Sequence, residues 1–377
     1  MNAKVLKTLE YNKIIARLTE HATSDPGRKL CRELTPMTEL DDIRAAQRET
    51  GDALTRLFKK GSISFGNNRE LGMSLKSLEI GATLSAPELL RIAGLLENAG
   101  RVKAYGRQER EDMEEDSLTP LFQGIEPLTP VSNEIYRCIL SEEEISDDAS
   151  PGLKHVRRSM AVTTDRIHSQ LSGMVNGSLH SYLQDALITS RNGRYCIPVK
   201  AEYRSQVPGM IHDQSSTGST LFIEPAAVVN LNNQMRELEI KEQEEIEKVL
   251  AALSAQVADH AEDIAENQKI LTRLDFVFAK AELSLKMNGS EPKFNNDGII
   301  DIRKGRHPLL DEKAVVPIDI NIGRDFSTLL ITGPNTGGKT VALKTLGLFT
   351  LMGQAGLHIP AFDSSQLAVF DEVFADI

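Results

Sequence analysis

The feature that most restricts the fold of this chain is a long run without helix breakers. Between Pro225 and about Asn288 there is no glycine and no further proline, the two residues that most destabilise a helix interior. The apolar residues of this run recur at helical spacing and predict one continuous seam. They are Leu231, Met235, Leu238, Ile246, Val249, Leu253, Val257, Ile264, Leu271, Leu274 and Phe278. At about 1.5 Å per residue, a single helix over the run would reach ~95 Å.

A second long helix is predicted to begin at Ser150-Pro151. Its apolar residues keep alternating three- and four-residue steps, which is the pattern of a helix packed along a partner. They are Leu153, Val156, Met160, Ile167, Leu171, Met174, Tyr182 and Ala186. Two such helices would form a lever. Aromatic residues make up only 5% of the chain and tryptophan is absent, so we expect a mainly α fold.

Between the two predicted helices, the composition of about residues 190–224 shifts to glycine, serine and β-forming residues. The shift predicts short strands and a hairpin at the tip of a helical stalk. Cationic residues there are interleaved with Tyr195 and Tyr203, a combination typical of nucleic-acid-binding surfaces. The candidates are Arg191, Arg194, Lys200 and Arg204. A solvated β-edge with an ordinary share of cations explains the same residues equally well.

His212, Asp213 and Ser215 lie in the same segment and suggest a hydrolase. Residues so close in sequence rarely assemble a Ser-His-Asp triad, and no oxyanion-type motif accompanies them. We therefore do not expect hydrolytic chemistry at this position.

The chain before residue 150 is predicted to form amphipathic helices joined by turns. Ser85-Ala-Pro-Glu88 is a capping box that opens one of them, and the acidic run from Glu109 to Asp116 is expected on a solvated surface. Phe294 to Ile300 and Pro317 to Ile322 have the pattern of strands. We thus expect an N-terminal helical core domain over residues 1–149, a lever and clamp domain over residues 150–290, and the N-terminal part of an α/β domain over residues 291–377.

The strongest motif begins at Thr328 to Thr332, an apolar strand pattern that leads directly into G-x-x-x-x-G-K-T, the pattern of a phosphate-binding loop. Small residues are needed where the backbone curls to point its N–H groups at phosphate oxygens, and the helical run from Val341 to Met352 would favour an anion at its N-terminus. The predicted ATP-binding residues are Gly333, Pro334, Asn335, Thr336, Gly337, Gly338, Lys339 and Thr340. Lys339 would carry charge to the outer phosphates, and the Thr340 hydroxyl would bind Mg²⁺. The alternative is a glycine-rich turn that binds nothing.

Asp371 and Glu372 follow the apolar run Gln366 to Phe370. They imitate the strand-Asp-Glu motif that holds magnesium and activates water in nucleotide hydrolysis. Only about 30 residues separate Thr340 from this pair, which is a short spacing for such a motif. The residues after Glu372, Val373 to Ile377, also do not mark the end of a strand. We therefore expect no catalytic residue within this chain.

The composition limits the partners and the compartment. With a net charge of −11, the chain gains no general electrostatic attraction to nucleic acid, so any such contact must be local. Cys31, Cys138 and Cys196 are far apart and in no metal-binding spacing, which favours core thiols in a reducing, cytoplasmic compartment. No stretch approaches the ~18 apolar residues of a membrane span, and no signal-type segment opens the chain, so no membrane partner is expected.

Several of these motifs together resemble the MutS type two family. Gly305-Arg-His-Pro308 and then Ile331 to Thr340, with its unusual Gly-Pro-Asn, are similar to the start of the MutS ATPase domain. Leu271 to Glu282 is similar to the helix end that precedes this domain, and Leu9 to Ile15 and His212 to Pro225 are similar to the type two branch. The resemblance is to a branch that is expected to lack the N-terminal mismatch-reading domains of mismatch-repair MutS proteins and to begin directly at the lever region.

The resemblance implies a homodimeric ATPase that uses ATP and Mg²⁺, with nucleotide sites at the subunit interface and a clamp that closes on nucleic acid. It also implies that the signature loop, the magnesium-binding Asp, the catalytic Glu and a nuclease domain lie beyond Ile377, so that this chain is a truncated, inactive half of its parent. The expected function of the parent is to bind branched DNA, suppress homologous recombination and act as an endonuclease. The alternatives are a ribosome-collision sensor that splits stalled ribosomes and a nucleotide-binding scaffold without turnover.

Overall fold

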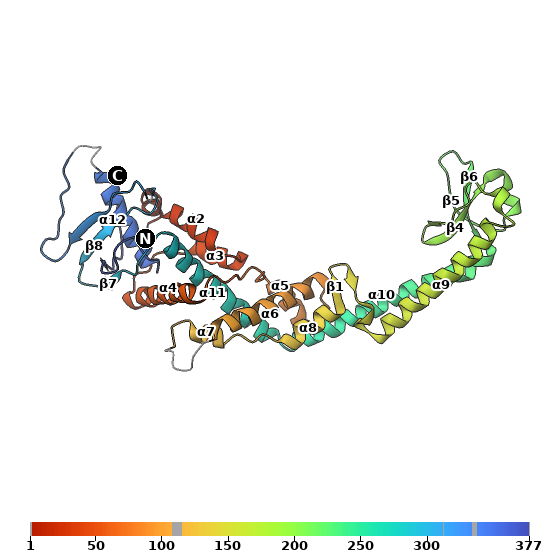
Figure 1. Ribbon diagram of the computed structural model, residues 1–377, viewed down its shortest axis with the longest axis horizontal. Coiled ribbons are helices and arrows are strands. Elements are labelled where there is room, and N and C mark those ends of the chain that lie inside the picture. Colours follow the sequence, from red (N-terminus) through yellow and green to blue (C-terminus); the bar gives the residue numbers. More distant parts are fainter. Residues whose placement is uncertain (1, 108–114, 312, 334–337, 377) are drawn as a thin grey trace. The chain divides into compact units, whose positions relative to one another are not determined.

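The computed structural model describes residues 2–107, 115–311, 313–333 and 338–376 (Figure 1). It divides into two compact units, each described by itself. The terminal unit comprises Met1–Lys76, Arg91–Ser132 and His260–Ile377, and the central unit comprises Ser77–Leu90 and Asn133–Asp259. The N-terminal helices and the segment after residue 290 thus share one unit.

The expectation of a mainly helical chain with small sheets is confirmed. The helices before residue 140 are α1 (Ala3–Thr8), α2 (Tyr11–His21), α3 (Asp25–Glu33), α4 (Leu40–Lys60), α5 (Gly72–Glu79), α6 (Ala86–Gly106), α7 (Thr119–Gln123) and α8 (Thr129–Cys138). The predicted capping box exists, since the Ser85 backbone N–H donates to Glu88 Oε2 over 2.9 Å before α6. No helix in the described part of the chain is both long enough and apolar enough to cross a membrane.

Helix α11 (Ala261–Lys286) is the centre of the terminal unit. Helices α2, α3 and α4 all pack against it. Every residue from Leu274 to Ala281 is buried. A helix segment that is buried on all of its faces needs other elements around it, so the N-terminal helices complete their core around α11.

A buried carboxylate fixes the turn between α2 and α3 on α11. Asp275, which is 2% exposed, accepts hydrogen bonds from the Thr23 and Ser24 backbone N–H groups over 3.0 and 2.8 Å and from both side-chain hydroxyls over 3.1 and 2.5 Å. Ser24 also caps α3 by accepting from the Gly27 N–H. A Cβ at Gly27 would lie only 2.1 Å from Asp275 Oδ2, so this position requires glycine.

A four-stranded sheet completes the terminal unit. Its order is β7 (Lys293–Asn295), β10 (Gln366–Ala368), β8 (Ile300–Gly305) and β9 (Ile318–Ile322). Strand β10 runs parallel to β7 and antiparallel to β8, which pairs antiparallel with β9. The predicted strand from Pro317 to Ile322 is confirmed. The prediction of one strand from Phe294 to Ile300 is wrong, because Asn295 Oδ1 accepts from the Asp297 and Ile299 N–H groups and turns the chain between β7 and β8.

The central unit combines two adjacent helices with a small sheet. The helices are α9 (Pro151–Val175), capped by Ser150 as predicted, and α10 (Val229–Ala258). The sheet order is β3 (Thr189–Arg191), β4 (Arg194–Lys200), β6 (Thr220–Pro225) and β5 (Gly209–Gln214), all antiparallel. Residues 190–224 therefore form the short strands and hairpin that their composition predicts.

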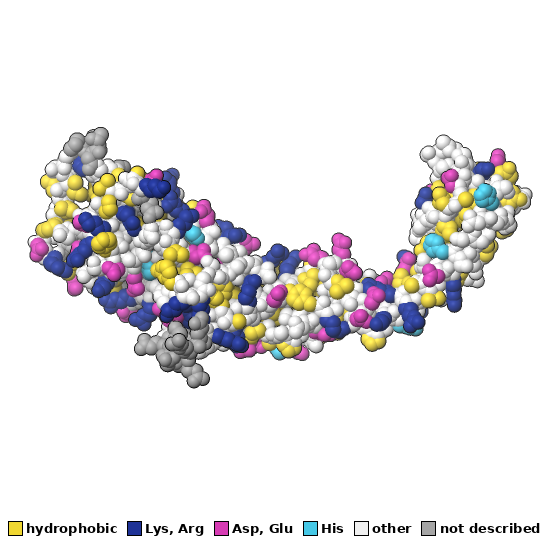
Figure 2. Space-filling model, viewed as in Figure 1, with side chains coloured by type: hydrophobic (Ala, Val, Ile, Leu, Met, Phe, Trp, Pro, Cys, Tyr) yellow, Lys and Arg dark blue, Asp and Glu magenta, His cyan; other side chains and the backbone are white. Residues whose placement is uncertain are grey.

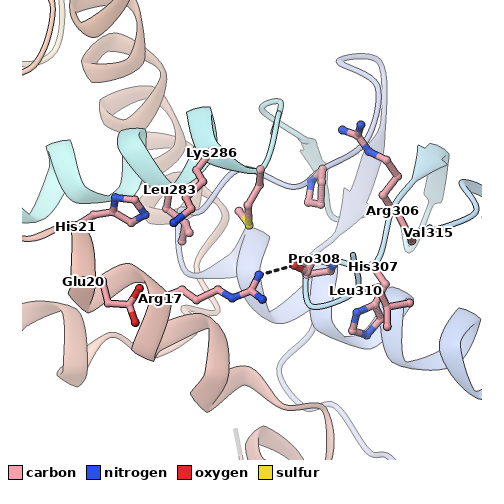
Figure 3. A pocket seen from close by; sticks show the side chains of 12 residues that line it. Arg17, Glu20, His21, Leu283, Lys286, Arg306, His307, Pro308, Leu310 and Val315 are labelled. Atoms are coloured by element: carbon pink, nitrogen blue, oxygen red, sulfur yellow. Dashed lines mark hydrogen bonds between the residues drawn. The ribbon is translucent and has the colours of Figure 1, made fainter. Parts of the chain in front are cut away.

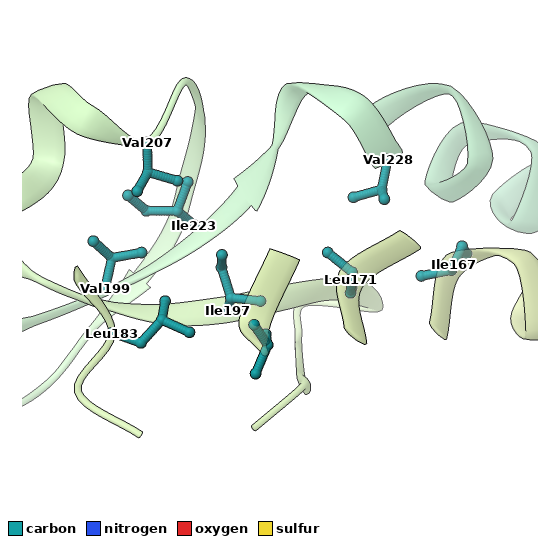
Figure 4. Packing of buried hydrophobic residues seen from close by; sticks show 9 residues of the cluster. Ile167, Leu171, Leu183, Ile197, Val199, Val207, Ile223 and Val228 are labelled. Carbon is teal, nitrogen blue, oxygen red and sulfur yellow. The ribbon is translucent and has the colours of Figure 1, made fainter. Parts of the chain in front are cut away.

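An apolar cluster joins this sheet to the end of α9 (Figure 4). Its buried members are Ile167, Leu171, Val175, Leu183, Ile197, Val199, Val207, Ile223 and Val228. Three members lie in the C-terminal half of α9, Val228 directly precedes α10, and others lie in strands β4 and β6. The sheet is consequently supported by its own core, separate from the core around α11.

The prediction of one helix from Pro225 to about Asn288 is wrong. Helix α10 ends at Ala258 and α11 starts at Ala261, with His260 at φ −119°, ψ 18° between them. The predicted series of apolar residues has a gap between Val257 and Ile264, so the pattern that favours a continuous helix is interrupted at this turn. Asp and His are also weak helix formers, and the acidic residues of the first turn of α11 favour a new N-terminus there.

The predicted extension of the first long helix to Ala186 is also wrong. Helix α9 ends at Val175, and Asn176 and Gly177 lead into a short 3₁₀ turn at His180–Tyr182. Tyr182 packs against the cluster of Figure 4, so its spacing reflects tertiary packing rather than a continued helix.

We predict that Gly27→Ala destabilises the terminal unit by about 1–3 kcal/mol, because the new methyl group displaces the Asp275 carboxylate from its donors. Urea unfolding followed by circular dichroism measures the loss. Gly100→Ala in α6 is the matched control: its Cβ would meet Pro127 at an ordinary 3.7 Å, and alanine favours a helix by ~1 kcal/mol. Equal stability of the two variants would contradict the role given to Asp275.

Candidate functional site

The predicted phosphate loop ends at the first residue of helix α12 (Lys339–Gln354). Gly338 caps this helix in the left-handed region, at φ 79° and ψ 6°, and Gly333 has φ 142°. Side chains with a Cβ rarely adopt either conformation. The two glycines of the motif therefore occupy backbone positions that require glycine, as the motif predicts.

Two predicted site residues, Lys339 and Thr340, begin helix α12. Lys339 Nζ donates to the Gly333 carbonyl, so the lysine spans the two ends of the loop. Thr340 is exposed in the first turn of α12. The other four predicted residues, Pro334, Asn335, Thr336 and Gly337, lie outside the described residues.

The N-terminus of α12 has features that suit an anion. Gly338 offers no side chain to cap the first N–H groups, and the first turn contains no acidic residue. These N–H groups and the helix dipole carry partial positive charge. A phosphate group would supply the missing acceptors.

The prediction of a strand over Thr328 to Thr332 is wrong for this structure. These residues have no regular secondary structure, and Leu330 is 83% exposed. A strand needs ladder partners on a neighbouring strand, and no described segment pairs with this one. The apolar pattern is therefore present without the neighbour that would turn it into a strand.

Asp371 and Glu372 are exposed and irregular. Strand β10 ends at Ala368, so it does not carry these carboxylates at its end. Glu372 instead lines an apolar groove along α12, beside Leu343 and Leu346.

A cation-rich cleft of about 360 Å³ lies where α2, the end of α11 and the Gly305-Arg-His-Pro308 turn meet (Figure 3). Arg17 Nη1 donates to the Pro308 carbonyl over 2.6 Å, and Arg306 Nη2 donates to the Asn288 carbonyl over 3.1 Å. The charged and imidazole side chains that line it are Arg17, Glu20, His21, Lys286, Arg306 and His307. Burial lowers the pKa of His307, so this imidazole is neutral at pH 7.

Of the four candidate cations, Arg191 lies in β3, Arg194 and Lys200 lie in β4, and Arg204 lies in the 3₁₀ helix Ala201–Gln206 that follows β4. The structure gives most of them internal partners. Arg194 contacts Glu224 Oε1 at 2.8 Å and donates to Asn233 Oδ1 over 2.6 Å. Arg204 donates to the carbonyls of residues 207 and 209 over 3.1 and 3.0 Å. These two guanidinium groups therefore stabilise the sheet.

Arg191 also has internal partners, since its Nη1 donates to Thr189 Oγ1 over 3.0 Å and to the Ser190 carbonyl over 2.8 Å. Arg191 lies 3.2 Å from Asp213, which is half exposed, and over the Phe222 ring at 4.0 Å. Lys200 lies 5.9 Å from the Tyr203 ring centre, with no carboxylate partner among the described residues. On the face shown in Figure 2, basic and acidic side chains are interspersed, so a nucleic-acid contact would depend on such single cations.

Glu224, which sequence reasoning missed, is the centre of a buried polar network. Its carboxylate is fully buried; Oε1 accepts from Asn232 over 2.8 Å and Oε2 lies 2.6 Å from His212 Nε2. Burial alone would raise the pKa of Glu224, but hydrogen bonds from Asn232, His212 and Arg194 hold it below its ordinary value. A glutamate inside the apolar run Thr220–Pro225 was the available signal.

The same network explains why no triad forms. A bulge in β5 between Ile211 and Asp213 turns His212 toward Glu224. Asp213 contacts Arg191 instead, and Ser215 Oγ accepts from the Thr220 N–H. The three residues that suggested a hydrolase therefore have three different partners.

The comparisons with known proteins agree on one family. A family model described as MutS domain V matches residues 329–377. The protein named Endonuclease MutS2 of Agathobacter rectalis is 60% identical over 378 residues, covering 100% of this chain and 48% of that protein. The Endonuclease MutS2 of Lachnoclostridium phytofermentans is 57% identical over 383 residues, with the same coverage, and that of Clostridioides difficile is 46% identical over 379 residues. The chain spans about half the length of the curated relatives it matches.

We predict that Glu224→Gln destabilises the central unit at pH 7 by about 2–4 kcal/mol, because it leaves Arg194 without its buried partner. The folded-state pKa of Glu224 is below 4.5, so the wild-type advantage is full above pH ~4.5 and shrinks as the pH falls further. Thermal unfolding at pH 7 and at acidic pH measures it. Asp213→Asn, which alters a half-exposed pair, should cost less than ~1 kcal/mol; an equal loss would refute the special role of Glu224.

Proposed function

The chain belongs to the MutS type two family, and from this premise we propose that it binds ATP with Mg²⁺ through residues 333–340. The observation that supports this most directly is the positive φ of both glycines of the motif, Gly333 at its start and Gly338 immediately before α12. Glycine at both positions and a helix start without a side-chain cap are the backbone features that a phosphate-binding loop needs.

Each described residue has a distinct role in the proposed site. Lys339 leaves the Gly333 carbonyl and binds the outer phosphates, while the N–H groups at the start of α12 bind phosphate oxygens. The exposed Thr340 hydroxyl is suited to be one Mg²⁺ ligand. When bound, Mg²⁺ would neutralise charge on the phosphates.

For the whole protein we propose a homodimeric, cytoplasmic ATPase that binds branched DNA, suppresses recombination and acts as an endonuclease. The name of the relatives, Endonuclease MutS2, supports DNA as the first candidate. Splitting of stalled ribosomes through rRNA contacts is the second candidate, because single surface cations suit either polyanion. A nucleotide-binding scaffold without turnover is the third. We propose little hydrolysis by this chain alone, since Asp371 and Glu372 lie beyond the end of β10.

We predict that Lys339→Ala weakens binding of a non-hydrolysable ATP analogue by at least tenfold, because a charged contact to phosphate contributes ~1.5–3 kcal/mol. Titration calorimetry on the full-length protein with Mg²⁺ measures this. Lys313→Ala, an exposed lysine between β8 and β9, is the control and should leave the affinity unchanged. An unaltered affinity in Lys339→Ala would remove the basis for the assignment.

We predict that Lys200→Gln lowers the slope of log affinity against log salt by roughly one for duplex-containing ligands, because one phosphate contact is lost. The measurement uses the full-length protein with branched DNA and with structured rRNA. Lys241→Gln, an exposed lysine on α10, changes the net charge equally and should leave the slope unchanged. If the two variants behave alike on both ligands, the tip is only structural; a change confined to rRNA would favour the ribosome.

A further inference from the structure

The turn between α1 and α2 has a strained backbone. Glu10 lies in the left-handed region at φ 60° and ψ 26°, a conformation that glutamate rarely adopts. Such strain persists only where the surrounding structure holds it, and strained residues gather at functional sites. The contacts of Leu9 and Glu10 therefore identify what this turn holds.

Both residues contact helix α12. Leu9 is 2% exposed, and its Cδ1 lies 2.8 Å from where a Cβ of Gly347 would be. The leucine thus fills the notch that the missing side chain leaves in the helix. Beside it, Lys344 Nζ contacts Glu10 Oε2 at 3.1 Å, while Lys13 binds the other carboxylate oxygen.

The ion pair is formed at neutral pH. Hydrogen bonds from Lys13 and Lys344 lower the pKa of Glu10 to about 2, so the carboxylate is charged. The Glu10 and Lys344 side chains are only about a quarter exposed, which reduces screening by salt. Leu9 supplies a steric contact and Glu10 a directional one, and together they restrict both sliding and rotation of α12.

The contacts lie close to the proposed nucleotide site. At about 1.5 Å of rise per residue, Lys344 is ~7.5 Å and Gly347 ~12 Å along the helix from Lys339. A helix is stiff over so short a distance. Fixing α12 at Lys344 and Gly347 consequently fixes Lys339 and Thr340 at its start.

The turn itself is anchored at the other end of α2. His21 Nδ1 lies 3.4 Å from Glu282 Oε2 on α11, and Asp275 of α11 holds Thr23 and Ser24 immediately after it. Helix α2 is therefore attached to α11 at its C-terminal end and to α12 at its N-terminal end.

We propose that the Leu9–Glu10 turn positions the phosphate loop, holding α12 so that Lys339 and Thr340 face the nucleotide. The proposal rests on the proposed ATP binding at residues 333–340. Leu9 and Glu10 are positioning residues, because they act through Gly347 and Lys344. A movement of α12 on binding nucleotide would be transmitted by the same contacts to α2 and from there to α11.

The test is a size exchange in the full-length protein. Gly347→Ala places a methyl group against Leu9 and should raise the Kd of a non-hydrolysable ATP analogue roughly three- to tenfold. Leu9→Ala combined with Gly347→Ala returns the space and should restore most of the affinity. Lys344→Gln, which removes only the ion pair and should fold normally, should weaken binding in the same direction.

Lys13→Gln is the matched control. This variant removes the other cation from Glu10, whose described ion pair with Lys13 does not involve α12, so it should leave the Kd at the wild-type value. If Gly347→Ala and Lys344→Gln bind the analogue like the wild type while Lys339→Ala does not, the turn is only structural and the proposal fails. If Lys339→Ala also binds normally, the nucleotide assignment itself fails.

Discussion

The terminal unit depends on one buried carboxylate. An unpaired ion in the interior costs several kcal/mol, and Asp275 avoids this because Thr23 and Ser24 supply four donors from a single turn. If the turn moved on α11, the buried carboxylate would lose one or more of these hydrogen bonds. That loss costs free energy, so other positions of the turn are disfavoured. Because α2 ends at that turn, Asp275 also determines where the opposite end of α2 meets α12.

The sequence correctly predicted the parts of the fold that depend on interactions between residues a few positions apart. The caps at Ser85 and Ser150 act within a few residues, so sequence spacing is sufficient to find them. The break at His260 and the missing strand over residues 328–332 depend on whether a neighbour covers or pairs with the segment. Periodicity describes the segment and not its neighbour, and both predictions were wrong for that reason.

The same distinction applies to the candidate sites. The glycines of the phosphate loop could be predicted, because their φ values follow from the loop's own geometry. The sequence shows no partner near the candidate cations of residues 191–204. In the structure, however, Arg194 binds Glu224, which lies thirty residues away and is brought close by the pairing of β4 with β6. Glu10 was visible only as part of a family resemblance, since nothing in its local sequence reveals a left-handed backbone or a partner in α12.

Helix α12 is held by unusually close approaches at three glycines. A Cβ at Gly347 would meet Leu9 at 2.8 Å, one at Gly353 would meet Phe294 at 2.7 Å, and one at Gly305 would meet Phe349 of α12 at 3.0 Å. Two of these contacts adjoin strained residues, Glu10 and Lys304, at φ 60° and 50°. Backbone strain at these two residues brings neighbouring elements very close to α12. The benefit of this strain is a fixed position for the helix rather than additional buried area. Since Lys339 and Thr340 begin that helix, the same packing also fixes where these two residues lie.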